Sequence, residues 1–150
     1  GQMQTTLPTS STSQASATTI LSFSVVDDGT DGFPTDVVKV FVMAGAALDP
    51  AIRLDEVLAG AQLRDSLGNS VEGSLFEDKI VFTDATFAVA DGGSETLEID
   101  VWLDPTFAST WIGTTLPFSL RGGYDVRGDG SGTRLACQGG EVLNEVEIVP

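Results

Sequence analysis

The sequence predicts an all-β chain: a single antiparallel, immunoglobulin-like β-sandwich with an extended N-terminal tail. Short segments of alternating apolar and polar residues recur along it, clusters of turn residues separate them, and long helical patterns are missing. One domain is the default for 150 residues, and a chain of this length buries roughly 70% of its unfolded surface. We expect residues 20–150 to form the sandwich and residues 1–19 to form the tail.

The tail differs in composition from the rest of the chain. Residues 1–19 are rich in Thr, Ser, Gln and Ala and contain no charged side chain. This composition is typical of a linker, although Thr and Ser tolerate extended structure and Pro8 suits an edge strand. Fully extended, such a tail reaches about 60 Å, far enough to leave its own domain. Its candidate donor-strand residues are Thr5, Thr6, Leu7, Pro8, Thr9, Ser10, Ser11 and Thr12.

The clearest strand follows the turn at Asp91-Gly92-Gly93. Its two faces are Leu97, Ile99, Val101 and Leu103 on one side, and Thr96, Glu98, Asp100 and Trp102 on the other. Alternation with a period of two predicts a strand with one face on a core and the other in water. Pro105 ends this strand because proline cannot donate to a ladder.

Other strands are expected to cover that apolar face. They are predicted at residues 20–26, 37–43, 61–64, 71–76, 79–83, 87–89, 116–121, 134–137 and 142–149. One or two helical turns are predicted from Leu54, ended by Gly60. The total of about eight to ten strands is typical of a sandwich.

The charge and cysteine content exclude several classes of function. With 22 acidic and 7 basic residues, the net charge is −15, which argues against binding nucleic acid or anionic membranes. No apolar run is long enough for a transmembrane helix, so no membrane insertion is expected. The acidity fits a solvated surface, bound divalent cations or a habitat of high salt. Cys137 stands alone, either as a small buried hydrophobic residue or as an exposed thiol for intermolecular pairing.

No catalytic arrangement is visible, so we expect no enzyme and no required cofactor. Without His, the chain lacks a base for His-dependent nucleophilic catalysis and lacks zinc ligands. Calcium is an open alternative, because Ca²⁺ prefers carboxylate oxygens on flexible loops. Asp and Gly also simply form turns. The candidate calcium ligands are Asp27, Asp28 and Asp31 in one loop, and Asp125 and Asp129 in another.

Two aromatic residues are candidate interface anchors. Trp102 falls on the polar face of its strand, and Phe41 falls on the second face of the segment 37–43. An outward aromatic residue is either scattered surface or the anchor of a partner surface.

A resemblance to a known family follows from several segments between residues 20 and 121. They are Phe23-Ser24-Val25-Val26-Asp27-Asp28-Gly29 with Pro34-Thr35 after it, Ala59-Gly60-Ala61-Gln62-Leu63-Arg64-Asp65, Ile80-Val81-Phe82, Ala90-Asp91-Gly92 continuing to Leu103, and Phe118-Ser119-Leu120. The chain resembles the β-sandwich modules repeated in large secreted and surface proteins of Bacteroidota-type bacteria, many of which carry sorting signals for type IX secretion. The resemblance implies a secreted, structural or adhesive module, with no catalytic residues to transfer.

Two functions are therefore predicted. The first is a structural subunit of an extracellular filament, a homopolymer in which the tail adds a β-strand to the neighbouring subunit. The alternative is a monomeric cell-surface adhesion module that binds a glycan or a surface protein, with the tail as a linker. Both place the protein outside the cell.

Overall fold

The computed structural model of the protein describes residues 3–27, 35–44, 52–83, 85, 87–128, 133–137 and 140–150. The strands are β1 (Met3–Pro8), β2 (Thr18–Val26), β3 (Thr35–Met43), β4 (Leu58–Arg64), β5 (Ser70–Glu72), β6 (Ser74–Leu75), β7 (Lys79–Phe82), β8 (Phe87–Val89), β9 (Ser94–Leu103), β10 (Thr115–Arg121), β11 (Val126–Gly128), β12 (Thr133–Arg134), β13 (Ala136–Cys137) and β14 (Glu141–Val149). One α-helical turn, α1 (Leu54–Val57), and two 3-10 turns, η1 (Gln14–Ser16) and η2 (Ala108–Trp111), complete the described elements.

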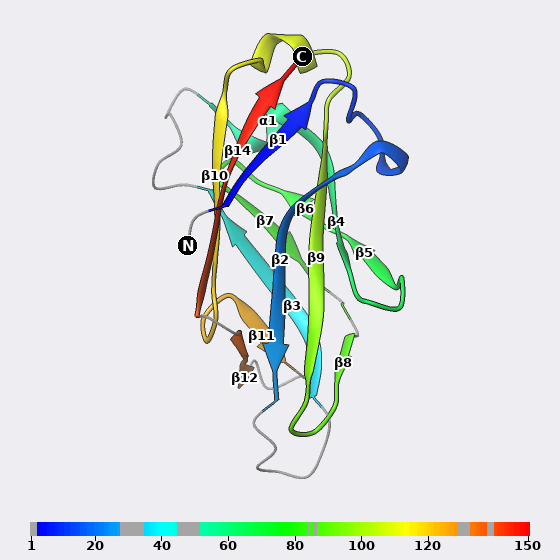
Figure 1. The fold of residues 1–150 in the computed structure, drawn as a ribbon, viewed down its shortest axis with the longest axis vertical. Coiled ribbons are helices and arrows are strands. Elements are labelled where there is room, and N and C mark those ends of the chain that lie inside the picture. Colours follow the sequence, from blue (N-terminus) through cyan, green and yellow to red (C-terminus); the bar gives the residue numbers. More distant parts are fainter. Residues whose placement is uncertain are drawn as a thin grey trace.

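The strands form two sheets that pack face to face (Figure 1). The larger sheet has the order β1-β14-β10-β3-β11-β12, with β7 and β8 also on β3 and β6 on β7. The smaller sheet has the order β13-β2-β9-β4-β5. The predicted all-β, sandwich-like fold is confirmed, and the immunoglobulin-like assignment stays a prediction. One pair, β1 with β14, is parallel, whereas the other described pairs are antiparallel.

The core lies between the sheets, and β9 is central to it as predicted. Leu97, Ile99 and Val101 are 0% exposed, and β2 and β4 flank the strand on either side. The prediction for the opposite face of β9 was wrong at Asp100, which is only 4% exposed. Neighbouring polar side chains cover it, as described below.

Two segments change sheets where single continuous strands were predicted. Between β5 and β6, the chain leaves the smaller sheet for the larger one at Gly73. A Cβ on Gly73 would lie 2.7 Å from the Phe82 ring, so glycine is needed for this close crossing. The second change falls at Leu135, because β12 pairs with β11 in the larger sheet and β13 with β2 in the smaller.

The short helix is also shorter than the pattern predicts. α1 ends at Val57, and β4 begins at Leu58, opposite Leu103 of β9. The chain therefore leaves the helical conformation and pairs with β9 before it reaches Gly60. No described helix is long and apolar enough to cross a membrane.

Candidate functional site

The N-terminal segment lies on its own domain. β1 pairs in parallel with β14 of the same chain, from Met3 opposite Asn144 to Pro8 opposite Val149 (Figure 1). It thereby forms one edge of the larger sheet. Of the predicted donor-strand residues, those at positions 5–8 belong to β1, and those at positions 9–12 belong to the connection toward η1.

The side chains of Leu7 and Thr5 fix the register of β1. Leu7 is fully buried in the core. The Asn144 amide donates from Nδ2 to Thr5 Oγ1 at 2.8 Å and to the Ile20 carbonyl at 2.6 Å, joining β1, β14 and β2. A slip by one residue would expose Leu7 and break the contact with Thr5. Asn144 Oδ1 is buried without a hydrogen-bond partner among the described residues.

The open edge of β1 is poorly suited to pairing with a further strand. The Thr9 N–H donates to the Val149 carbonyl at 2.9 Å, so the backbone polar groups of Thr9 point toward β14. Successive residues of a strand direct these groups to opposite sides, so those of Thr6 and Pro8 point toward the open edge. Proline has no N–H, and the Pro8 carbonyl already accepts from the Ser11 N–H at 2.9 Å. Pro8 therefore hinders the pairing of this edge with a strand of another chain, a role that proline commonly has in natural edge strands.

The connection from β1 to β2 is tied to the body of the domain. The Leu103 N–H at the end of β9 donates to the carbonyl of Ser11 at 2.7 Å. The buried Ser11 hydroxyl donates to the carbonyl of Ser16 at 2.7 Å and accepts from Thr18 Oγ1 at 3.1 Å. The tail therefore behaves as an integral part of the sandwich.

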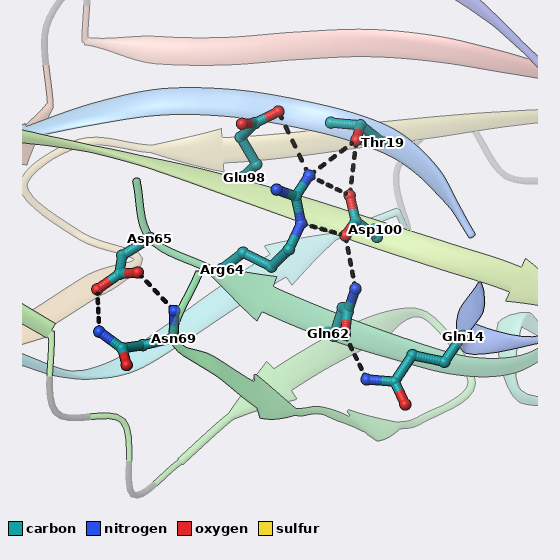
Figure 2. A network of polar contacts seen from close by, with 8 residues as sticks. All are labelled: Gln14, Thr19, Gln62, Arg64, Asp65, Asn69, Glu98 and Asp100. Atoms are coloured by element: carbon teal, nitrogen blue, oxygen red, sulfur yellow. Dashed lines mark hydrogen bonds and ion pairs between the residues drawn. The ribbon is translucent and has the colours of Figure 1, made fainter. Parts of the chain in front are cut away.

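A polar network covers the outer face of the smaller sheet (Figure 2). Asp100 accepts from both Nε and Nη2 of Arg64, the latter at 3.0 Å. It also accepts from Thr19 Oγ1 at 2.6 Å and from Gln62 Nε2 at 2.8 Å. Gln62 in turn accepts from Gln14 Nε2 at 2.7 Å, which links η1 to the network.

The network keeps Asp100 ionised. Burial alone would raise the pKa of Asp100, but the hydrogen bonds from Arg64, Thr19 and Gln62 outweigh burial and lower it below its ordinary value. The Asp100 carboxylate raises the pKa of Arg64 in return. Because every strong acceptor position of Asp100 is occupied, we interpret this cluster as structural.

The two predicted interface aromatics are both half-buried and belong to different sheets. Phe41 on β3 lies under the Arg127 guanidinium, 5.7 Å from the ring centroid. Trp102 on β9 packs over Gly60 so closely that a Cβ there would lie 2.2 Å from the indole. Ala59, Gly60, Gly73 and Trp102 line a shallow cavity of about 300 Å³. The structure does not bring Phe41 and Trp102 together.

The predicted calcium ligands are partly described. Asp28, Asp31 and Asp129 lie outside the described residues. Asp27 and Asp125 are buried and serve turns: Asp27 accepts from the Gly92 N–H at 3.3 Å, and Asp125 accepts from the Arg121 N–H at 2.7 Å. Within the described ranges, no group of three or more His, Cys, Asp or Glu residues forms a metal-binding cluster. Calcium binding stays a prediction.

Cys137 is buried, as its apolar sequence context predicts. Burial, with a smaller contribution from the charge of Asp125, raises the pKa of the thiol to about 11. The thiol is therefore protonated and weakly nucleophilic at neutral pH.

Sequence reasoning missed a concave site that is lined by α1 and the β9–β10 connection. These two segments lie at the same end of the sandwich (Figure 1). This cavity, here called the end pocket, has a volume of about 480 Å³. Its lining residues are Asp55, Glu56, Asp104, Phe107 and Trp111. The backbone explains their meeting, because the Asp104 N–H donates to the Val57 carbonyl at 3.3 Å. Some fifty residues separate the two segments, so no local pattern reveals the pocket.

The end pocket combines carboxylates with aromatic rings. Phe107 is 53% exposed, whereas Trp111 is half-buried and packs against the core. Arg53 contacts Asp55 at 3.1 Å, and its hydrogen bond lowers the pKa of that carboxyl group. Asp104 accepts from the Thr106 N–H at 2.9 Å, which holds its carboxylate in place. The pocket is therefore anionic at neutral pH.

Comparison with known proteins gives no family assignment: no protein-family model matches the chain, and neither does any curated protein.

Proposed function

We propose that this chain is a self-contained, non-catalytic β-sandwich module of the cell surface that binds a partner at one end. The observation that carries the proposal is the end pocket, which joins exposed aromatic surface to fixed carboxylates in a concave site. Ligand sites are typically concave and apolar, with a few placed polar groups. Loops and short connections at the ends of sandwiches commonly carry binding functions.

The position of β1 supports a module that is complete by itself. Because β1 is tethered to its own chain, it competes for the edge of β14 at an effective concentration on the order of mM. At µM protein, a β1 strand from another chain is therefore disfavoured by roughly a thousandfold. The acidic surface keeps such modules apart in solution. The family resemblance favours secretion.

The binding proposal is tested by nuclear magnetic resonance on the ¹⁵N-labelled full chain. A short basic peptide and a neutral oligosaccharide, maltotriose, are titrated separately. We expect one of these probes to shift the amide signals of α1 and of residues 104–112. If neither probe shifts these signals at mM concentration, the proposed binding function is wrong.

A second candidate, the filament subunit, is favoured by one observation: β1 is an uncharged terminal edge strand joined to the body through residues 9–17. Exchange of β1 between chains would preserve its contacts and propagate head to tail. Electron microscopy of the full chain at high concentration, with salt and calcium, tests it. Filaments that form with Thr6→Asp but disappear with Leu7→Asp would support exchange, and isolated particles throughout would contradict it.

A further inference from the structure

The end pocket has a charge and a shape that fit one class of ligand. We propose that it binds a basic side chain, a lysine or arginine, displayed by a partner protein. This inference rests on the proposed binding function and names its ligand class.

The first support is an excess of negative charge at this end of the sandwich. Arg53 lies 3.1 Å from Asp55, 3.7 Å from Glu56 and 3.8 Å from Glu77, so one guanidinium is shared by three carboxylates. Asp104 adds a fourth carboxylate on the other wall. The local sum of these five groups is therefore −3, inside a chain of net charge −15. A concave site lined by one sign of charge concentrates ligands of the opposite sign.

The second support is that other aromatic rings of this chain are in contact with basic side chains. Basic side chains lie over three rings in the described part: Lys79 over Phe76, Arg121 over Tyr124 and Arg127 over Phe41, at 5.6, 5.1 and 5.7 Å from the centroids. Phe107 and Trp111 take part in no such contact within the described residues. Cations are attracted to the faces of Trp and Phe rings. An external basic side chain would provide the cation that these two rings lack.

The chemistry also separates this ligand from its competitors. An anion would be repelled by the pocket, and an aliphatic ligand would have to desolvate the Asp104 and Glu56 carboxylates without pairing them. A neutral sugar could stack on Phe107 but would gain little from the net charge. A basic side chain uses both features, since its aliphatic stem packs on the rings while its charged head meets the carboxylates.

The experiment uses the ¹⁵N-labelled full chain and four probes. Two are the blocked peptides acetyl-Gly-Lys-Gly-amide and acetyl-Gly-Arg-Gly-amide. The third replaces the basic residue with norleucine, which keeps the stem without the charge, and the fourth is maltotriose. We expect the basic peptides to shift the signals of α1 and residues 104–112 and to bind several-fold more weakly when the ionic strength rises from about 0.02 to about 0.2 M.

Substitutions then locate the site. Asp104→Asn keeps an oxygen for the Thr106 N–H, and each of Asp104→Asn and Phe107→Ala should weaken binding roughly two- to fivefold. Glu141→Gln and Leu67→Ala change an exposed acid at the start of β14, opposite the last residue of β10, and an exposed apolar residue between β4 and β5. Both lie away from the end pocket and should leave binding unchanged. Equal weakening by Glu141→Gln would overturn the inference, because it would indicate diffuse attraction to the acidic surface.

The outcomes also separate the two proposals. If maltotriose or the norleucine peptide shifts the signals of the end pocket as strongly as the basic peptides, the ligand class is wrong while the binding function survives. If no probe shifts them, both proposals fail.

Discussion

At the scale of single residues, Asp100 is the central acceptor of the polar network on the outer face of the smaller sheet. Alternation places it correctly on the face opposite Leu97 and Ile99, but it cannot reveal that the carboxylate is buried. Its partners come from β4 and from the start of β2, so their convergence depends on strand register. Arg64 and Gln62 lie two residues apart on β4, which puts both on the same face.

We predict that Asp100→Asn destabilises the fold by roughly 1–3 kcal/mol at neutral pH. The substitution removes the buried carboxylate partner of Arg64. The Arg64 side chain keeps Glu98 at 3.5 Å and, being 31% exposed, can be partly rehydrated. The native fold lowers the pKa of Asp100, so its stabilisation is fully present above the ordinary carboxyl pKa of about 4 and is lost as the pH falls through the lowered value.

The measurement is urea unfolding of the wild type and the variant between about pH 7 and pH 2.5. We expect the difference in free energy of unfolding to be constant above about pH 5 and to narrow below about pH 4. Asp78→Asn, at an exposed position, is the control and should change stability by less than about 0.5 kcal/mol. A difference that grows as the pH falls would contradict this account of Asp100.

At the scale of elements, sequence patterns predicted the strands whose faces alternate clearly. β9, β10 and β14 lie where apolar residues recur with a period of two. β1 lacks this signal, since Met3 and Leu7 are its two apolar side chains before Pro8 and the residues between them are Gln and Thr. Its partner, β14, begins more than a hundred residues later, and a parallel pairing over that separation leaves no local trace. The change of sheet at Gly73 depends in the same way on the distant Phe82 ring.

We predict that Leu7→Ala lowers the free energy of unfolding by about 2–4 kcal/mol, because it removes a fully buried side chain from the core between the sheets. Thr6→Ala is the matched control on the exposed face of the same strand and should cost less than about 0.5 kcal/mol. Chemical denaturation at several protein concentrations measures both. A cost for Leu7→Ala that changes with concentration would indicate that β1 docks on another chain.

At the scale of the whole molecule, the two sheets, the N-terminal strand in the larger sheet and the end pocket are the features on which the proposed binding module rests. Composition alone predicted an acidic single domain with a separate, uncharged tail. It could not predict that the tail completes the larger sheet or that residues of α1 and the β9–β10 connection form one pocket. Both features arise from long-range packing, which a pattern along the chain does not encode.

The most direct test of the central claim, that β1 completes its own sandwich, is the mass of the full chain in solution. Size-exclusion chromatography with multi-angle light scattering measures it from about 1 µM to about 100 µM, well below the effective concentration of the tethered strand, in salt and with calcium. We predict one chain, 15.6 kDa, throughout this range. A mass that rises with concentration in the wild type and in Thr6→Asp, but stays at that of one chain in Leu7→Asp, would contradict the claim and identify β1 as a strand exchanged between subunits.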